Sequence, residues 1–404
     1  MKDEALHQGP GFHHWKSQEN LMSAPEDAAA SRVLSWLHVG DLHLTAAGEE
    51  NHRDLGRIVA LANALPPGSL DFAVLPGDNA DDGMPEQFRL VRDAVAPLRL
   101  PLRILPGDHD FKPGSSDGRS APGLDAYHAV LGAERLPFAE KVAGRRCLFL
   151  DVVSAGTGGP DFRVGEAQLA WAEREVEAAG AAGQDVVLFM HTYPADLREG
   201  GDRLGALLAR PQVLCVDMGH THYNELANDG GTVFMATRST GQVEEGPPGF
   251  SVAAVDGRTV SWRFKPLDAA WPFVLITQPA DRRLATHASQ AMDGSCPVRA
   301  KVLGDAPVDA VEAQVDDGAW AAMAPVPGAV ALWELPKAAA GGQVRVRARD
   351  ARGRQDTDAV MPARSGWTFP ERAADGSDRD RVGAWPEKGI LDTQLGPNRN
   401  GRTW

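Results

Sequence analysis

The sequence Val-Gly-Asp-Leu-His, at residues 39–43, follows an apolar run at Val33–Leu37. Such a run is typical of a buried β-strand that ends in a polar turn. One residue separates Asp41 from His43, so both side chains point to the same side where the strand ends. We therefore expect a carboxylate and an imidazole to face a common point beyond this strand, as the ligands of a metal ion do.

The same arrangement recurs along the chain, where apolar segments end in short turns that contain Asp or His. Further strands are expected at 71–76, 100–105, 185–190 and 213–218, and helices at 54–65, 86–96 and 165–179. The turns after these strands contain Asp78, then Asp108, His109 and Asp110, then His191, and finally His220 and His222. Alternating strands and helices favour an α/β fold, which collects polar side chains at the carboxyl ends of its strands.

Each of these residues alone is explained by a capped turn or a loop hydrogen bond. A single metal site, in contrast, explains all of them together. Carboxylate and imidazole ligands without thiolates favour Mn, Fe, Zn or Ni over Ca or Mg. The ligands are too many for one tetrahedral ion, so two ions that share a bridging carboxylate fit better. We expect two divalent or mixed-valence transition-metal ions, with Mn, Fe or Zn as the candidates.

Composition limits the classes of partner and the compartment. The 404 residues carry a net charge of -14, which argues against nucleic acid as a bulk partner because phosphates need a basic surface. No apolar run is long enough to span a membrane, and no secretory signal is recognisable at the start of the chain. The three cysteines, Cys147, Cys215 and Cys296, form no CxxC pair. A reducing cytoplasm is therefore the expected location.

The chain divides into four regions. Residues 1–31 read as a flexible leader, and residues 32–267 carry the alternating strands and helices. From 268 to 363 short alternating segments, such as Val344–Ala348, predict a small all-β sandwich. The tail at 364–404 is polar and carries scattered tryptophans. It either packs on the catalytic domain or forms a disordered end.

The motifs Asp41-x-His43, Gly77-Asp78, Gly107-Asp108-His109-Asp110, His191 and Gly219-His220-Thr221-His222 resemble the calcineurin-like metallophosphoesterase superfamily. The resemblance covers about residues 33–266, and residues 168–171 and 219–222 are most similar to its cyclic nucleotide phosphodiesterase-like branch. It implies a four-layer αββα metallophosphoesterase sandwich as the catalytic domain at 32–267. The region that follows resembles the immunoglobulin-like domains found after some of these catalytic domains.

The resemblance also implies a role for each residue. Asp41, His43 and His222 would hold one ion, whereas Asp108, His191 and His220 would hold the other. Asp78 would bridge the two ions, which would flank a hydroxide nucleophile. His109 would be a proton donor or a phosphate contact, oriented by Asp110, and its imidazole can protonate a leaving oxygen.

Asp108 departs from the superfamily, which usually has Asn at this position. An amide offers a neutral carbonyl and an N–H donor, whereas an ionised carboxylate offers a full charge and no donor. The predicted function is a phosphoester hydrolase for a small phosphorylated substrate, with phosphodiesters slightly favoured over monoesters. The alternatives are a phosphomonoesterase, a phosphonate-type hydrolase, or a catalytically weak scaffold protein. The sequence leaves open whether the chain forms a homodimer.

Overall fold

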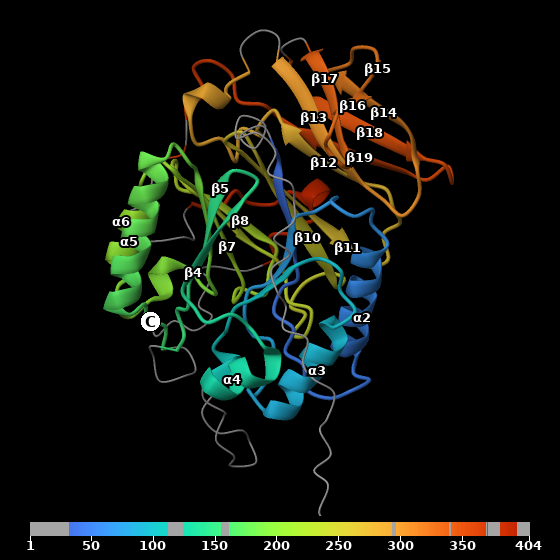
Figure 1. Ribbon diagram of the computed structural model, residues 1–404. Coiled ribbons are helices and arrows are strands. Elements are labelled where there is room, and N and C mark those ends of the chain that lie inside the picture. The colour runs from blue at the N-terminus through green and yellow to red at the C-terminus, as the bar shows by residue number, and fades with distance from the viewer. Residues whose placement is uncertain are drawn as a thin grey trace, which may run out of the picture.

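The computed structural model of the protein describes residues 32–111, 124–154, 161–292, 296–338, 341–368, 370 and 380–393. The leader expected at 1–31 lies outside these residues. Two β-sheets face each other at the centre of the N-terminal part, and further strands follow beside them (Figure 1). In the part of the chain that the structure describes, no helix is both long and apolar enough to cross a membrane.

The first central sheet has five strands in the spatial order β11-β10-β1-β2-β3. Their bounds are Leu34–His38 for β1, Phe72–Leu75 for β2, Leu102–Ile104 for β3, Gly249–Asp256 for β10 and Thr259–Pro266 for β11. Strands β1, β2 and β3 run parallel, whereas β10 pairs with β1 in the antiparallel sense. The turns that follow the three parallel strands therefore lie at the same edge of the sheet.

The second central sheet has six strands in the order β4-β5-β6-β7-β9-β8. Their bounds are Phe138–Val142 for β4, Arg145–Phe149 for β5, Val186–Phe189 for β6, Val213–Met218 for β7, Glu225–Asn228 for β8 and Val233–Ala236 for β9. Strands β5, β6, β7 and β9 are parallel neighbours. This sheet thus offers a second set of carboxyl-end turns.

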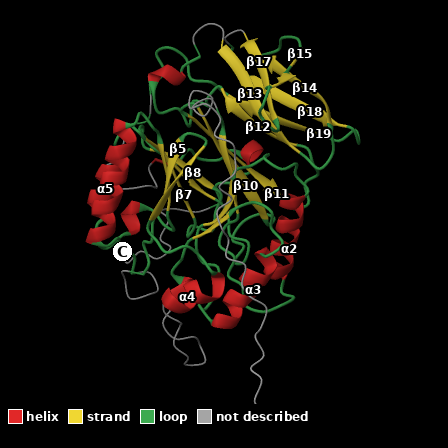
Figure 2. Ribbon diagram, in the orientation of Figure 1, coloured by secondary structure: helices red, strands yellow, loops and turns green. Residues whose placement is uncertain are grey.

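Helices cover the outer face of each sheet (Figures 1 and 2). Helices α2 (Glu50–Asn63) and α3 (Pro85–Val95) lie on the first sheet, and α5 (Glu166–Ala181) and α6 (Gly201–Leu208) lie on the second. A short helix, α4 (Leu124–Leu131), contacts α3. The N-terminal part therefore has two sheets between two layers of helices, and a later all-β region follows it, so the predicted fold class is confirmed.

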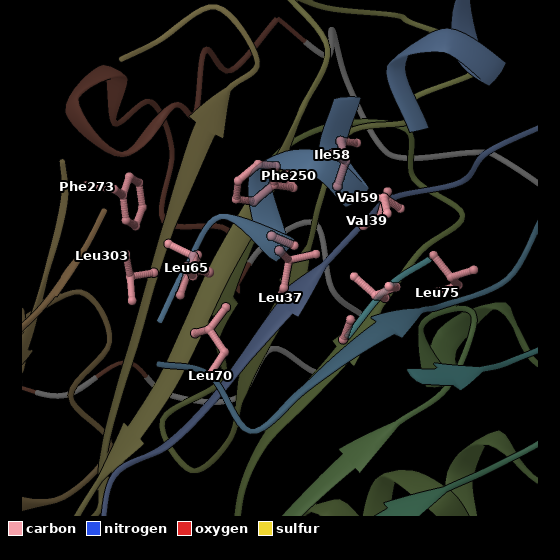
Figure 3. Packing of buried hydrophobic residues seen from close by; sticks show 14 of the residues in the cluster. Leu37, Val39, Ile58, Val59, Leu65, Leu70, Leu75, Phe250, Phe273 and Leu303 are labelled. Atoms are coloured by element: carbon pink, nitrogen blue, oxygen red, sulfur yellow. The ribbon is translucent and has the colours of Figure 1, made fainter. Parts of the chain in front are cut away.

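Side-chain alternation along β1 explains how one strand serves two cores. Trp36 faces the second sheet, where it packs with Phe72 and Phe189 between the sheets. The next residue, Leu37, points to the opposite face and packs with Ile58 of α2 (Figure 3). Because both faces of the strand are buried, apolar side chains occupy both of them, Trp36 on one and Leu37 on the other.

The all-β region consists of two four-stranded antiparallel sheets, ordered β12-β13-β17-β16 and β15-β14-β18-β19. The bounds are Phe273–Gln278 for β12, Cys296–Leu303 for β13, Val308–Val315 for β14, Ala321–Ala322 for β15, Ala324–Pro325 for β16, Leu332–Ala338 for β17, Val344–Asp350 for β18 and Gln355–Val360 for β19. Phe273 and Leu303 of this region join the same apolar cluster as Leu65 and Leu70, as Figure 3 shows. The region is thus attached to the outer side of the first central sheet.

Several elements differ from the expectation in extent or were not expected. Helix α2 begins at Glu50, one turn before the expected start at Asp54. Strand β8, at Glu225–Asn228, and helix α6, at Gly201–Leu208, were not predicted. Their sequences conceal them: β8 contains buried polar residues, and α6 contains two glycines, which disfavour a helix.

Candidate metal centre

Seven Asp and His residues that the sequence singles out lie in turns at the carboxyl ends of strands from both sheets. The first sheet supplies Asp41 and His43 after β1, Asp78 after β2 and Asp108 after β3; the second supplies His191 after β6, and His220 and His222 after β7. All seven side chains are buried. The site therefore lies where the polar ends of two apolar sheets meet.

The first group of side chains is centred on Asp108. The Asp108 Oδ1 atom lies 3.2 Å from His191 Nε2 and 3.3 Å from His220 Nδ1. The Oδ1 atom of Asp78 is 3.5 Å from the same nitrogen of His191. One atom from each of these four residues lies within 4.8 Å of the others, which suits a shared cation.

The second group contains His43, His222 and again Asp78. The Nε2 atoms of the two histidines are 3.1 Å apart, and His43 Nε2 is 3.7 Å from Asp78 Oδ2. Asp78 therefore turns one oxygen to each group. This is the arrangement that a carboxylate bridging two ions requires.

Four of these residues adopt left-handed backbone conformations. The φ angles are 43° for His43, 50° for Asp78, 66° for His220 and 62° for His222. A left-handed conformation costs a non-glycine residue roughly 1–3 kcal/mol and is found most often at functional sites. The surrounding structure holds these side chains in position at the expense of local backbone energy.

Two glycines permit the close approach of the turns. A Cβ atom at Gly77, whose φ is 133°, would lie 2.2 Å from His191 Nδ1. A Cβ atom at Gly219 would lie 2.4 Å from Asp41 Oδ1. Because real Cβ atoms do not approach so closely, only glycine lets these turns bring their neighbours to the site.

Asp41 provides the test of whether a cation fits. It belongs to neither group, and its Oδ1 atom lies 3.9 Å from His191 Nδ1 rather than among the atoms of His43 and His222. Both of its carboxylate oxygens are buried and accept no hydrogen bond within the described residues. Burial raises the pKa of Asp41 despite the nearby imidazoles. A buried carboxylate without donors is costly unless a positive charge compensates it, which a bound cation would do.

The other carboxylates of the site are stabilised in their charged form. Burial and Asp108 would each raise the pKa of Asp78, but His191 and His43 outweigh them and lower it to about 2. Burial would also raise the pKa of Asp108, but hydrogen bonds from His191 and His220 hold it well below its usual value. Both carboxylates are thus anionic at neutral pH, as metal ligands must be.

His109 lies at the rim of the site, beside residues that the sequence reasoning did not single out. Its backbone N–H donates to Asp78 Oδ1 at 2.8 Å, and its Nδ1 atom lies 2.8 Å from the carbonyl oxygen of Asp81. The Asp81 carboxylate lies 3.7 Å from His109 Nδ1 and 3.4 Å from His43 Nδ1. Gln242 also donates to that carboxylate, at 3.0 Å. Asp81 lies three residues after Asp78 in the same turn, and this spacing is the signal that could have identified it.

Asp110 does not orient His109 as the sequence reasoning expected. Its fully buried carboxylate accepts hydrogen bonds from Asn79 Nδ2 at 2.8 Å, and from the backbone N–H groups of Ala80 and Gly107 at 2.9 Å. Burial and the nearby Asp78 raise the pKa of Asp110 to about 6. The residue ties the turn after β2 to the turn after β3, so its contribution to the geometry of His109 is indirect.

Comparisons with known proteins find a family match in the N-terminal part of the chain. Residues 34–224 match the family model described as calcineurin-like phosphoesterase. The N-terminal part of this chain thus matches the calcineurin-like phosphoesterase family and has the metallophosphoesterase α/β fold. The matched residues begin at β1 and extend just beyond His222, so they include all seven of the side chains described above.

Two curated relatives of the metallophosphoesterase domain are named as phosphodiesterases. The chain is 27% identical over 235 residues to the 3',5'-cyclic adenosine monophosphate phosphodiesterase CpdA of Escherichia coli, a match that covers 55% of this chain and 81% of the relative. It is 29% identical over 205 residues to the glycerophosphodiester phosphodiesterase GpdQ of Enterobacter lignolyticus, covering 46% and 69%. A dimetal phosphatase from Danio rerio is similar at a TM-score of 0.46 and 13% identity, covering 58% of this chain and 96% of the other.

The family match and the two phosphodiesterase relatives identify the chain as a metal-dependent phosphoesterase, as the sequence predicts. The two side-chain groups around Asp78 fit a dinuclear divalent metal site. Carboxylate and imidazole groups without thiolates do not single out one transition metal.

Proposed function

We propose that the chain is a dinuclear metal-dependent phosphoester hydrolase that favours small phosphodiesters over phosphomonoesters. One ion would be held by Asp41, His43 and His222, and the other by Asp108, His191 and His220. Bound there, the two cations would supply a nucleophile at neutral pH and offset charge on the phosphoryl oxygens. The observation that carries the proposal is the position of Asp78, whose two oxygens face the two groups of histidines.

His109 is proposed as the residue that donates a proton to the leaving oxygen. Its Nδ1 atom is held at the carbonyl of Asp81, so the Nε2 atom faces away from that contact. The side chain is 20% exposed, whereas the rings of His43 and His191 are buried, so His109 is the histidine of the site most accessible to a substrate. An imidazole fixed at one nitrogen and open at the other is suited to general acid catalysis.

The preference for diesters is proposed from the charge of Asp108. Its carboxylate adds a negative charge where the superfamily usually has a neutral amide. Coulomb repulsion grows with the product of the charges, so a dianionic monoester is repelled more strongly than a monoanionic diester. The two relatives described above carry phosphodiesterase names, which supports the same preference.

The test is a reconstitution experiment. The purified chain would be stripped of metal and reloaded with Mn, Fe or Zn. Matched nitrophenyl monoesters, diesters and phosphonates, and cyclic nucleotides, would then be assayed as substrates. We expect close to two ions per chain, turnover that is lost in chelator, and a higher kcat/KM for diesters. A chain that binds no metal and hydrolyses none of these substrates would instead be a scaffold protein.

We further propose that the all-β region is an immunoglobulin-like module at 268–363 with a structural or dimerising role. Its two antiparallel sheets and their shared apolar core support this assignment. Sedimentation of the full chain measures the mass in solution and so distinguishes the two roles. A chain that is monomeric at all concentrations would support the structural role. A dimer that dissociates on dilution would support the dimerising role.

A further inference from the structure

The C-terminal segment at 380–393, called the clamp here, packs against the strand that follows the His222 turn. The backbone N–H of Val382 donates to the carbonyl of Leu226 in β8 at 2.9 Å. Trp385 and Ile390 of the clamp are buried in the core between the two central sheets. The clamp is therefore an integral part of the N-terminal fold, although more than a hundred residues separate it from β11 in sequence.

The carbonyl oxygen of Gly389 in the clamp contacts two residues that lie close to the candidate metal site in sequence or in space. It accepts hydrogen bonds from Asn224 Nδ2 at 2.8 Å and from Arg238 Nη2 at 2.7 Å. Both side chains are 2% exposed. Asn224 follows His222 by only two residues, so this contact anchors the turn that presents His222.

Asn224 connects the clamp to the neighbouring loop as well. The Oδ1 atom of Asn224 accepts a hydrogen bond from the backbone N–H of Arg238 at 2.9 Å, and the backbone N–H of Asn224 donates to Glu245 Oε1 at 2.9 Å. The other oxygen of Glu245 accepts from Thr393 Oγ1 of the clamp at 2.6 Å. Asn224 is thus held at three polar atoms, and two of its partners also bond the clamp.

This network acts on a turn whose backbone needs support. His222 adopts a left-handed conformation, which a histidine keeps only when its surroundings impose it. The carbonyl of His222 also accepts a hydrogen bond from the N–H of Ser239, the residue after Arg238. The contacts that fix the backbone around His222 therefore converge on residues that the clamp holds.

The far side of the clamp reaches the all-β region. Lys388 Nζ donates to both carboxylate oxygens of Asp358 in β19, at 2.6 and 2.7 Å, and both residues are buried. Asp358 also accepts from the backbone N–H of Ile276 in β12 at 2.8 Å. The clamp therefore contacts both parts of the chain at once.

We propose that Asn224 is a positioning residue through which the clamp at 380–393 fixes His222, so that the affinity for one of the two metal ions depends on the clamp. The proposal rests on the proposed function to the extent that His222 is taken as a metal ligand. None of the three hydrogen bonds of Asn224 described above involves an atom of a candidate ligand. It acts on the metal through the backbone of the turn.

Asn224→Ala and Asn228→Ala form a matched pair for the test. Asn228 is also a buried Asn of the same strand region, and its Nδ2 atom donates to the carbonyls of Arg283 and Ala285, each at 3.0 Å. Mn²⁺ binding to the metal-stripped full chain would be followed by calorimetry, together with the melting temperature. Loss of outer support typically weakens a metal site by about 10–100-fold. We expect that loss for one ion only in Asn224→Ala, and unchanged binding of both ions in Asn228→Ala.

Thr393→Val keeps the proposal testable if Asn224→Ala does not fold, because it removes only the hydrogen bond to Glu245. It should weaken the same ion, by a smaller factor. The proposal would be overturned if Asn224→Ala and Thr393→Val bound both ions as tightly as the wild type does. It would also be overturned if Asn224→Ala and Asn228→Ala lost the same amount of metal affinity. A wild-type chain that binds no pair of ions would instead overturn the proposed function, and the clamp proposal with it.

Discussion

The Oδ1 atom of Asp108 lies 3.2 Å from Nε2 of His191. The carboxylate of Asp108 thus places a full negative charge beside this imidazole, at the position where the superfamily usually has an amide. His220 approaches the same oxygen at 3.3 Å, and hydrogen bonds from both rings hold the pKa of Asp108 well below its usual value despite burial. The added charge is therefore present in the folded protein at neutral pH, where it can discriminate between substrates of different charge.

Asp108→Asn should raise monoester turnover relative to diester turnover. A unit charge about 4 Å away is worth roughly 4 kcal/mol at an effective dielectric near 20. Water and bound cations screen much of this, so we expect a change of about tenfold in the ratio, or about 1.4 kcal/mol. The measurement is kcat/KM for one matched monoester and diester in both proteins at equal metal content. An unchanged ratio, or a shift toward diesters, would show that the charge of Asp108 does not select substrates.

Asp78→Ala should remove metal as well as activity, because its two oxygens face both groups of histidines. Metal content by mass spectrometry and turnover of a nitrophenyl diester would be measured on the same preparation. Asp82→Ala is the control, since Asp82 belongs to the same turn but to neither metal-binding group. Full metal content with near-normal turnover in Asp78→Ala would rule out the bridging role.

The gathering of the seven candidate ligands was largely predictable from sequence because they lie in short turns directly after apolar strands. The contact between Asp81 and His109 was not, because it depends on how the turn after β2 meets the turn after β3. Asp110 was misassigned for the same reason. Its neighbour in sequence is His109, but its carboxylate points inward to Asn79.

Elements stabilised by distant partners were also hidden from the sequence. Strand β8 contains Glu225 and Asn228, which read locally as loop residues. In the structure Glu225 pairs with Arg381 at 2.6 Å, and Asn228 donates to two carbonyls near Arg283. Because these contacts join segments that are 55 or more residues apart, no local sequence pattern predicts them.

His109→Ala should lower turnover by roughly a hundredfold or more on substrates with poor leaving groups, the usual scale for general acid catalysis. The loss should be smaller for nitrophenyl esters, which leave without a proton. Both ions should stay bound, because His109 is absent from the two groups that contain Asp78. The measurement is kcat for an alkyl and a nitrophenyl diester with each protein. Equal losses on both substrates would assign His109 another role, such as contact with the phosphate.

Lys301→Met should stabilise the protein at neutral pH, because Lys301 of β13 is only 4% exposed. Burial lowers its pKa to about 8, although Asp71 partly opposes the shift. Between this value and the ordinary pKa near 10.5, the unfolded chain binds more protons, so the free energy of unfolding of the wild type rises with pH. The cost of burying the charge is fully present below about pH 8 and is lost above about pH 10.5.

The advantage of Lys301→Met over wild type should therefore be largest at pH 7, on the order of 3 kcal/mol, and should shrink as the pH rises toward 10.5. Urea unfolding at pH 7, 8.5 and 10 measures it. Lys141→Met is the control, since Lys141 is an exposed lysine of β4 and its replacement relieves no burial. A difference between Lys301→Met and wild type that is constant with pH would mean that packing, rather than the buried charge, sets the effect.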